Sequence, residues 1–487
     1  MAGPVLLTAR WLVSDEGGER RLLEHGEVVF DKGAITFVGH GYPGEVARRI
    51  DYGQALVGPG FIDLDALSDL DTTILGYDNQ PAARKGRVWP RDYAPYEHYS
   101  PEELAFQKRY AFAWLLRNGI TTALPIASLF YRAWGETTEE FAAAAGAAQD
   151  LGIRAYLGPA YRTGNMVVND DGSIDTVYDE ERGLAELAAA EKFCRELEGR
   201  AGGLIRTMLA PDRIETSTAR LLRRTAAISA ELDVPVRLHC CQSLIEYQLV
   251  LRQHGMSPPE WLDSLGFLSE RCLLPHGTYV SGSSRIDRPG RDLEIIRDSG
   301  ASLVHCPLVS GRHGNVIESF RRYRAMGLKI GLGTDTAPPD MVRNMQFGMA
   351  LCRVVESDAS AVRSEDYYDA ATRGGADALR RPDLGRIAEG ARADITVFDL
   401  SGFELGQVID PIQTMMLTGS GRDFRTVIVD GRFVMEDRVI PGFDEREAAV
   451  RAQKQFEGVM ARYPERTLGH PPAEEIFSSA YPVRRRP

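Results

Sequence analysis

Acidic and histidine side chains stand at the ends of several short apolar segments of this chain. Asp65 follows the first segment, and His239, His276, His305 and Asp335 end later ones. Carboxylate and imidazole groups are the side chains that hold divalent metals and transfer protons near neutral pH. Each of them needs a partner when it is buried. Their repeated placement therefore predicts a functional site rather than ordinary packing.

The elements that must position these side chains are eight apolar runs separated by longer helical patterns. The runs are 55–64, 120–126, 153–161, 204–211, 234–240, 272–280, 301–308 and 329–335. Strands that alternate with helices are typical of a parallel sheet. Eight repeats favour an α/β fold of the (β/α)8 TIM barrel type, which carries its chemistry at the carboxyl ends of the strands. A doubly wound open sheet is the alternative, but it would want a glycine-rich turn after its first strand.

Both ends of the chain carry strand–turn–strand patterns that frame the repeats. The patterns lie at 5–13 with 27–38, and at 393–398 with 426–434. We therefore predict a composite β-sandwich from 1–54 and 380–445, a barrel from 55–379, and a C-terminal helix and tail from 446–487. Helix starts are predicted at Ser100, with Glu103 completing a capping box, and at Thr137.

Composition limits the partners. The 487 residues include 57 Lys and Arg against 69 Asp and Glu, a net charge of −12. This balance argues against nucleic acid or an anionic membrane as a partner. No apolar run is long enough to span a membrane, and the six cysteines show no metal-binding spacing. We expect a cytoplasmic protein with reduced thiols and a small-molecule substrate, assembled as a homodimer or higher homo-oligomer.

Several motifs, in this order, resemble the amidohydrolase superfamily, and most closely its cytosine deaminase and triazine hydrolase (chlorohydrolase) branch. They are Pro59-Gly60-Phe61-Ile62-Asp63-Leu64, Gly119-Ile120-Thr121-Thr122, His239, Pro275-His276, Val304-His305-Cys306-Pro307-Leu308, Gly331-Leu332-Gly333-Thr334-Asp335 and Ala393-Asp394. The resemblance implies a metal-activated hydroxide that attacks a ring carbon or an amide carbonyl. In that family a His-x-His pair, a strand-five histidine and a strand-eight aspartate hold the metal, and a strand-six histidine supports the substrate or the water. The chain is thus expected to hydrolyse or deaminate a small, cyclic nitrogen compound.

Two positions depart from the family pattern. Where His-x-His is expected, the chain has Asp65-Ala66-Leu67, so the paired imidazoles are absent. The family's glutamate proton shuttle, three residues after the strand-five histidine, is replaced by Gln242. An amide neither accepts nor returns a proton at neutral pH. The resemblance therefore implies an atypical or absent metal site.

Two interpretations of the catalytic residues Asp65, His239, His276 and Asp335 stay open. In one, Asp65, His239 and Asp335 bind zinc or a harder divalent ion such as manganese. In the other, of equal weight, the site is metal-free, an aspartate acts as general base and the histidines bind or protonate the substrate. A metal-independent relative with lyase, isomerase or cyclisation chemistry is the main alternative function. A non-catalytic ligand-binding homologue is a further one.

Four further residues are candidates for substrate binding. Gln242 and His305 stand at strand ends, Trp89 lies in the long polar loop 69–99, and Arg162 follows the third run. Such loops cover barrel sites, so Trp89 is expected to lie over a planar ligand, with loop packing as the alternative. Arg162, or Arg213 after the fourth run, would neutralise an anionic substrate; a surface ion pair is the alternative.

Overall fold

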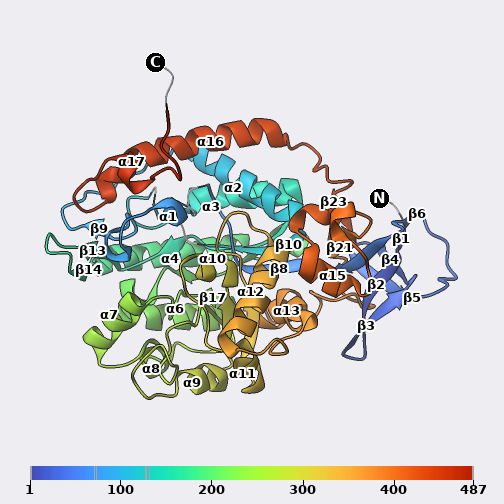
Figure 1. The fold of residues 1–487 in the computed structure, drawn as a ribbon, viewed down its shortest axis with the longest axis horizontal. Coiled ribbons are helices and arrows are strands. Elements are labelled where there is room, and N and C mark those ends of the chain that lie inside the picture. The colour runs from blue at the N-terminus through green and yellow to red at the C-terminus, as the bar shows by residue number, and fades with distance from the viewer. Residues whose placement is uncertain (1–2, 71, 73, 127–128, 131, 485–487) are drawn as a thin grey trace.

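The fold is that of a computed structural model, which describes residues 3–70, 72, 74–126, 129–130 and 132–484 (Figure 1). Strands gather at both ends of the chain, and strands alternate with helices between them. The predicted α/β class is confirmed at this level. Residues 485–487 of the predicted tail lie outside the described part.

Eight parallel strands form the central part of the molecule. They are β8 (Phe61–Ala66), β10 (Ile120–Pro125), β11 (Arg154–Leu157), β15 (Ile205–Thr207), β17 (Val236–Arg237), β18 (Cys272–Pro275), β19 (Ser302–His305) and β20 (Lys329–Leu332). Seven of the eight predicted apolar runs contain one of them, and the first run, 55–64, overlaps β8. They pair in the orders β15-β11-β10-β8 and β17-β18-β19-β20.

The two four-stranded sheets are joined on both sides. Leu209, just after β15, forms a parallel bridge with Val236 of β17. On the other side, the amide of Asp335 donates a hydrogen bond of 2.8 Å to the carbonyl oxygen of Asp65. All eight strands run in the same direction, so their carboxyl ends lie on one side of the molecule.

The first predicted run, 55–64, is two strands rather than one. β7 (Ala55–Pro59) leaves the central strands and joins an outer sheet, and β8 begins at Phe61. Gly60 lies at the break, where an added Cβ would lie 2.1 Å from Oγ1 of Thr121 on the neighbouring strand. This close approach of β8 to β10 requires glycine.

Strands from both chain ends share the six-stranded outer sheet, in the order β23-β22-β21-β7-β2-β3. Its other members are β2 (Trp11–Glu16), β3 (Glu19–Glu24), β21 (Ile395–Asp399), β22 (Phe424–Val429) and β23 (Arg432–Met435). A second sheet, β5-β4-β1-β6, is built from N-terminal residues alone: β1 (Val5–Thr8), β4 (Glu27–Asp31), β5 (Ala34–Gly39) and β6 (Arg48–Asp51). Within the N-terminal part of the predicted β-sandwich, β2 and β3 thus share a sheet with the C-terminal strands, whereas β1, β4 and β5 do not. Apolar side chains of both sheets, including Leu7, Val28 and Ile395, form one buried cluster.

Helices cover the central strands. The longer ones are α2 (Pro101–Arg117), α3 (Thr138–Leu151), α4 (Glu180–Leu197), α6 (Ala219–Leu232), α7 (Leu244–His254), α9 (Asp292–Ser299), α12 (Met341–Glu356), α13 (Ser364–Ala371), α15 (Pro411–Thr418) and α16 (Glu445–Arg462). Both predicted helix starts are confirmed, with the capping box at Ser100 complete and Thr137 capping α3. None of the helices in the described ranges combines the length and apolar character needed to cross a membrane.

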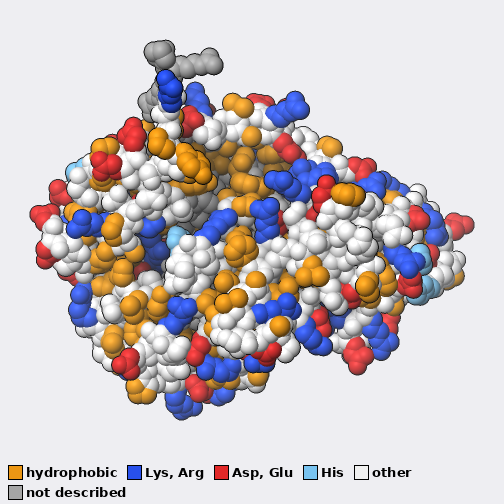
Figure 2. Space-filling model, in the orientation of Figure 1, with side chains coloured by type: hydrophobic (Ala, Val, Ile, Leu, Met, Phe, Trp, Pro, Cys, Tyr) orange, Lys and Arg blue, Asp and Glu red, His pale blue; other side chains and the backbone are white. Residues whose placement is uncertain are grey.

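The loop after β8 crosses the carboxyl ends of the strands. Within it, β9 (Trp89–Pro90) pairs with β13 (Gly164–Val168), which pairs in turn with β14 (Ile174–Tyr178). In Figure 1 these strands lie on the left of the view, and α16 runs along the top above α2. Figure 2 shows that the surface is hollowed below α16, where basic side chains gather beside apolar ones.

Candidate active site

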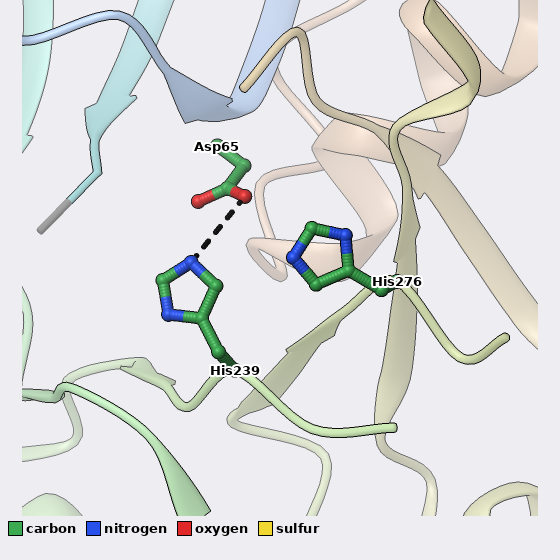
Figure 3. Close-up of side chains that lie close together, drawn as sticks. All are labelled: Asp65, His239 and His276. Atoms are coloured by element: carbon green, nitrogen blue, oxygen red, sulfur yellow. Dashed lines mark ion pairs between the residues drawn. The ribbon is translucent and has the colours of Figure 1, made fainter. Parts of the chain in front are cut away.

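Four of the predicted residues meet at the carboxyl ends of the central strands. Asp65 ends β8, His239 and His276 follow β17 and β18, and Asp335 follows β20. Nε2 of His239 lies 3.6 Å from Oδ2 of Asp65, and Nε2 of His276 lies 3.8 Å from Oδ2 of Asp335. Figure 3 shows the carboxylate of Asp65 and the two imidazoles pointing toward one another from separate strands. One ligand atom from each of these three lies within 4.8 Å of the others.

A backbone contact fixes the orientation of His239. Its Nδ1 lies 2.8 Å from the carbonyl oxygen of Asp212. A carbonyl oxygen only accepts hydrogen bonds, so Nδ1 carries a proton, and Nε2 keeps its lone pair when the ring is neutral. That lone pair faces Asp65. His239 is thereby prepared to bind a cation or accept a proton.

Asp63 and Thr334 fasten β8 to the segment after β20 beneath the site. The carboxylate of Asp63 accepts hydrogen bonds from Oγ1 of Thr334 at 2.6 Å and from its amide at 2.9 Å. It also accepts one from the amide of Asp65 at 3.2 Å. Burial raises the pKa of Asp63 to about 7. These bonds hold the backbone of Asp65 in place.

Arg237 is a functional residue that the sequence analysis missed. Its buried guanidinium donates to the carbonyl oxygen of Leu124 at 3.0 Å and lies 3.4 Å from Oδ1 of Asp65. Arg237 stands two positions before His239, and residues at that spacing along a strand face the same side; this spacing was the available signal. Burial alone would raise the pKa of Asp65, but His239 and Arg237 outweigh it and lower that pKa. By contrast, burial and repulsion from Asp65 raise the pKa of Asp335 well above its ordinary value.

Gln242 is held by two arginines. Its Oε1 accepts a hydrogen bond of 2.8 Å from Nη2 of Arg87 and another from Nη1 of Arg213. The carboxylate of Glu246 fixes the turn that carries Gln242, since it accepts from the amides of Cys241 and Gln242. With its oxygen occupied, Gln242 has its amide NH2 left to donate.

A cavity lies over the strand ends. His239 and Asp335 line it together with three of the predicted substrate-binding residues, namely Gln242, Trp89 and Arg162. The Trp89 ring lies against the Arg162 guanidinium, with 5.0 Å between the Cζ atom and the ring centroid. His276 lines a neighbouring cavity that shares Gln242.

His305 does not belong to this group. It is buried on the outer side of β19, where its Nε2 lies 3.5 Å from the Tyr367 hydroxyl and its ring packs on Phe320. Burial lowers the pKa of His305 to about 3. Side chains alternate along a strand, and Val304 occupies the inner face. At this strand end Cys306 faces the site instead, with Sγ 3.8 Å from Oδ2 of Asp65. The expectation that His305 binds substrate is therefore wrong.

The spacing of Asp65, His239 and His276 fits a metal ion, and Asp335 lies beside His276. Two ligands of a tetrahedral ion at 2.0–2.1 Å lie about 3.3 Å apart. The separations of 3.6 and 3.8 Å are close to that value and too long for hydrogen bonds. Oδ1 of Asp65 and Nε2 of His276 are buried without a hydrogen-bond partner. Two carboxylates and two imidazoles suit zinc or manganese.

Comparison with known proteins identifies the family. The model of the amidohydrolase family matches residues 58–434. The chain belongs to the amidohydrolase family. The match spans the central strands and the last strands of the outer sheet, so the resemblance found in the sequence is confirmed.

Deaminases are among the relatives of this amidohydrolase-family chain. It is 28% identical over 439 residues to the 5-methylthioadenosine/S-adenosylhomocysteine deaminase of Natronomonas pharaonis, covering 89% of this chain and 93% of the relative. It is also 28% identical over 357 residues to the 8-oxoguanine deaminase of Pseudomonas aeruginosa, covering 72% and 76%. The prediction of an amidohydrolase-like hydrolase acting on C–N bonds is confirmed at the level of the family.

Solved structures share the fold. An adenosine deaminase from Xanthomonas campestris with bound zinc superposes with a TM-score of 0.77 at 21% identity, covering 93% of this chain and 98% of that one. Atrazine chlorohydrolase from Arthrobacter aurescens gives a TM-score of 0.76 at 20% identity, with 93% and 100% covered.

Proposed function

We propose that this protein is a hydrolase that removes an amino or comparable leaving group from a carbon of a small nitrogen heterocycle. The observation that carries the proposal is the convergence of Asp65, His239, His276 and Asp335, with Nε2 of His276 buried without a hydrogen-bond partner, next to a cavity. Buried polar groups without partners are costly unless a ligand satisfies them. The relatives' names, which are those of deaminases, support the reaction class.

We infer that Asp65, His239 and Asp335, together with His276, hold one divalent ion. Such an ion lowers the pKa of a bound water and supplies a nucleophile at neutral pH. The protein's own groups do the rest. The carbonyl of Asp212 fixes the His239 tautomer, Arg237 balances the charge of Asp65, and Asp335 at the cavity wall is placed to take a proton from the attacking water.

The substrate that suits this cavity is planar. Trp89, Phe130 and Met166 provide apolar walls, and aromatic faces bind flat rings. Gln242 presents its NH2 group, which donates to a ring nitrogen or carbonyl of the substrate. Because Gln242 cannot transfer a proton, turnover of cytosine, guanine and aminotriazines is expected to fall about 10² to 10⁴-fold below that of an enzyme with glutamate there.

The proposed architecture is a closed (β/α)8 barrel with a composite β-sandwich. The hydrogen bonds that join the two parallel sheets on both sides support closure. The apolar cluster shared by the two outer sheets supports the sandwich. The domain boundaries proposed from sequence remain 1–54 with 380–445, 55–379, and 446–487, with β7 of the second range contributing to the outer sheet. A homodimer or higher oligomer in the cytoplasm also remains a prediction.

A second candidate is a metal-independent enzyme of the same fold. Two observations favour it: Leu67 supplies no ligand where the family has histidine, and Arg237 already places a buried cation 3.4 Å from Asp65. In that case an aspartate alone would act as the general base.

Elemental analysis of protein purified without added metal or chelator distinguishes the two candidates. The proposal expects about one divalent ion per chain, and ammonia release from at least one of methylthioadenosine, S-adenosylhomocysteine and 8-oxoguanine. His239→Ala and Asp335→Asn should lose the ion and the activity. His305→Gln is the matched control, because it changes a strand-end histidine outside the site and should keep both. Activity without a stoichiometric ion would instead establish the metal-independent candidate.

A further inference from the structure

A second cavity, with a basic wall, lies between α2, α12 and the start of α16. Among the described residues, it shares no lining residue with the two cavities at the active site. Four arginines from separate segments line it: Arg117 ends α2, Arg343 lies in the first turn of α12, Arg422 lies in η4 (Gly421–Asp423) and Arg438 follows β23. In Figure 2, basic and apolar side chains lie together on the surface below α16. Because the whole chain carries a net charge of −12, this concentration of positive charge indicates an anion-binding site.

The two carboxylates that line this cavity, Asp340 and Glu445, already have partners. Asp340 accepts hydrogen bonds from the amides of Arg343 and Gly421 at 3.1 and 3.0 Å. Its Oδ2 also lies 3.4 Å from Nε of Arg343. Oε1 of Glu445 lies 3.2 Å from Nε of Arg117. The carboxylates of the cavity wall therefore pair with two of the four arginines and leave the other two without a counter-ion from this wall.

These other two arginines are Arg422 and Arg438, and neither has a carboxylate within 4 Å in the described part of the chain. Nη1 of Arg438 donates a hydrogen bond of 3.0 Å to the carbonyl oxygen of Phe424. Burial, repulsion from Arg117 and, to a smaller extent, repulsion from Arg422 lower the pKa of Arg438. A nearby anion favours the charged form of such a group. A bound anion would therefore offset the repulsion among these guanidinium groups.

Three aromatic side chains line the same cavity, namely Tyr110, Trp114 and Phe443, and all three are partly exposed. Tyr110 and Trp114 lie one turn apart on α2, with ring centroids 5.5 Å apart and an angle of 75° between the rings. Aromatic faces that stay accessible bind flat rings by stacking. The cavity thus combines a surface for a planar ring with guanidinium groups for an anion.

We propose that this cavity binds a nucleoside phosphate, with its phosphate contacted by Arg422 and Arg438 and its base against the aromatic rings of α2. A phosphate suits the site better than a carboxylate, because several guanidinium groups can share its additional charge and its third oxygen. The proposal goes beyond the proposed function and does not depend on it, since the two sites have no lining residue in common.

Isothermal titration of the purified full-length protein compares UMP with uridine and with inorganic phosphate. Uracil carries no exocyclic amino group, so the proposed deamination does not consume the nucleoside probes. We expect UMP to bind about 10- to 100-fold more tightly than uridine, as charge-assisted hydrogen bonds do. UMP should also bind at least about tenfold more tightly than phosphate, because the base adds stacking. Its affinity should fall as the salt concentration is raised.

Three variants locate the site. Arg422→Gln and Arg438→Gln should each weaken UMP binding by about tenfold or more and leave uridine binding unchanged. Arg422→Gln keeps the test valid if Arg438→Gln fails to fold, because Arg422 is exposed and its guanidinium makes no hydrogen bond within the described ranges. Arg425→Gln is the matched control, since Arg425 pairs with Asp437 at the surface and does not line the cavity. It should bind UMP as tightly as the unaltered protein.

Two results would overturn the proposal directly. One is UMP that binds no more tightly than uridine or phosphate, and the other is UMP binding that is unchanged in both Arg422→Gln and Arg438→Gln. UMP binding that is lost in Arg162→Gln but kept in these two variants would place the nucleotide in the cavity over the strand ends, and this result would overturn the proposal as well.

Discussion

Gln242 differs from a glutamate by one side-chain atom. The effect of the substitution Gln242→Glu on activity nevertheless depends on the groups that contact this side chain. Arg87 and Arg213 both donate to its side-chain oxygen. In Gln242→Glu the two guanidinium groups would hold the pKa of the new carboxyl low, so it would accept and return protons poorly. We expect ammonia release to rise by less than about tenfold, short of the 10² to 10⁴ that a tuned acid–base group supplies.

Steady-state ammonia assays on Gln242→Glu and on the double variant Arg87→Met/Gln242→Glu measure this effect. The rate of ammonia release should rise more in the double variant than in the single variant, because the guanidinium of Arg87 no longer lowers the pKa of the new carboxyl. A rise of about 10² in the rate of ammonia release by Gln242→Glu would show that the two arginines do not prevent the new carboxyl from transferring protons.

Glu186 provides a pH-dependent prediction. Burial raises its pKa to about 7, although the amide of Gly135 donates to it. Between pH 4.5 and 7 the unfolded chain ionises this group while the folded chain keeps it neutral, so stability falls as the pH rises from about 4.5 to 7. Glu186→Gln should therefore stabilise the protein by about 2 to 3 kcal/mol more at pH 8 than at pH 5. Urea unfolding at both pH values measures the difference; an equal effect at the two would contradict the raised pKa.

The site residues show what sequence could and could not provide. His239 and Asp335 could be selected because they end apolar runs and match a family motif. His305 satisfied the same criteria and is nevertheless on the outer face, since a shift of one residue at a strand end reverses the direction of a side chain. Arg237 was missed although its spacing from His239 places both side chains on one face of the strand, because nothing in the sequence shows that Asp65 is its partner.

At the scale of elements, Asp340 joins a helix to a distant turn. Its carboxylate caps α12 by accepting a hydrogen bond of 3.1 Å from the amide of Arg343. It also accepts from the amide of Gly421 at 3.0 Å. Asp340→Ala removes the cap and leaves a second buried amide unpaired, so it should cost about 2 to 4 kcal/mol.

Asp410→Ala is the comparison. Asp410 caps α15 through the amide of Gln413 alone and is partly exposed, so the loss should be about 1 kcal/mol. Urea unfolding of the two variants measures both losses in the free energy of unfolding. Equal losses would show that the bond to Gly421 contributes nothing.

Element identity was predicted better than element boundaries. Every apolar run overlaps a central strand, because runs of β-branched residues between helical patterns give a strong signal. The break at Gly60 was not visible, since it arises from the approach of Thr121, a residue remote in sequence. The local sequence pattern around Gly60 does not indicate contacts with residues that are remote in sequence.

At the scale of the whole molecule, one buried ion pair ties the central strands to the outer sheet. Arg154 of β11 donates from Nε and Nη2 to both carboxylate oxygens of Asp394, each at 3.1 Å, and both residues are buried. Arg154→Met leaves this carboxylate unpaired and should cost about 3 to 5 kcal/mol.

Arg154→Met/Asp394→Asn should be more stable than the single variant, because the unpaired charge is removed while the side chain at 394 still accepts from the amide of Asp430. Arg195→Met, which breaks an exposed pair with Glu231, should change stability by less than about 1 kcal/mol. A double variant less stable than Arg154→Met would contradict the electrostatic explanation.

The pairing of β7 with β21 also sets an order of events during synthesis. Ala55 pairs with Asp399, so the N-terminal strands leave the ribosome long before their partner exists. At about 5–20 residues per second the wait is on the order of tens of seconds. Throughout that interval the hydrogen-bonding edge of β7 stays open to other chains. A nascent chain of this protein therefore depends on chaperones or on rapid completion to avoid intermolecular pairing at that edge.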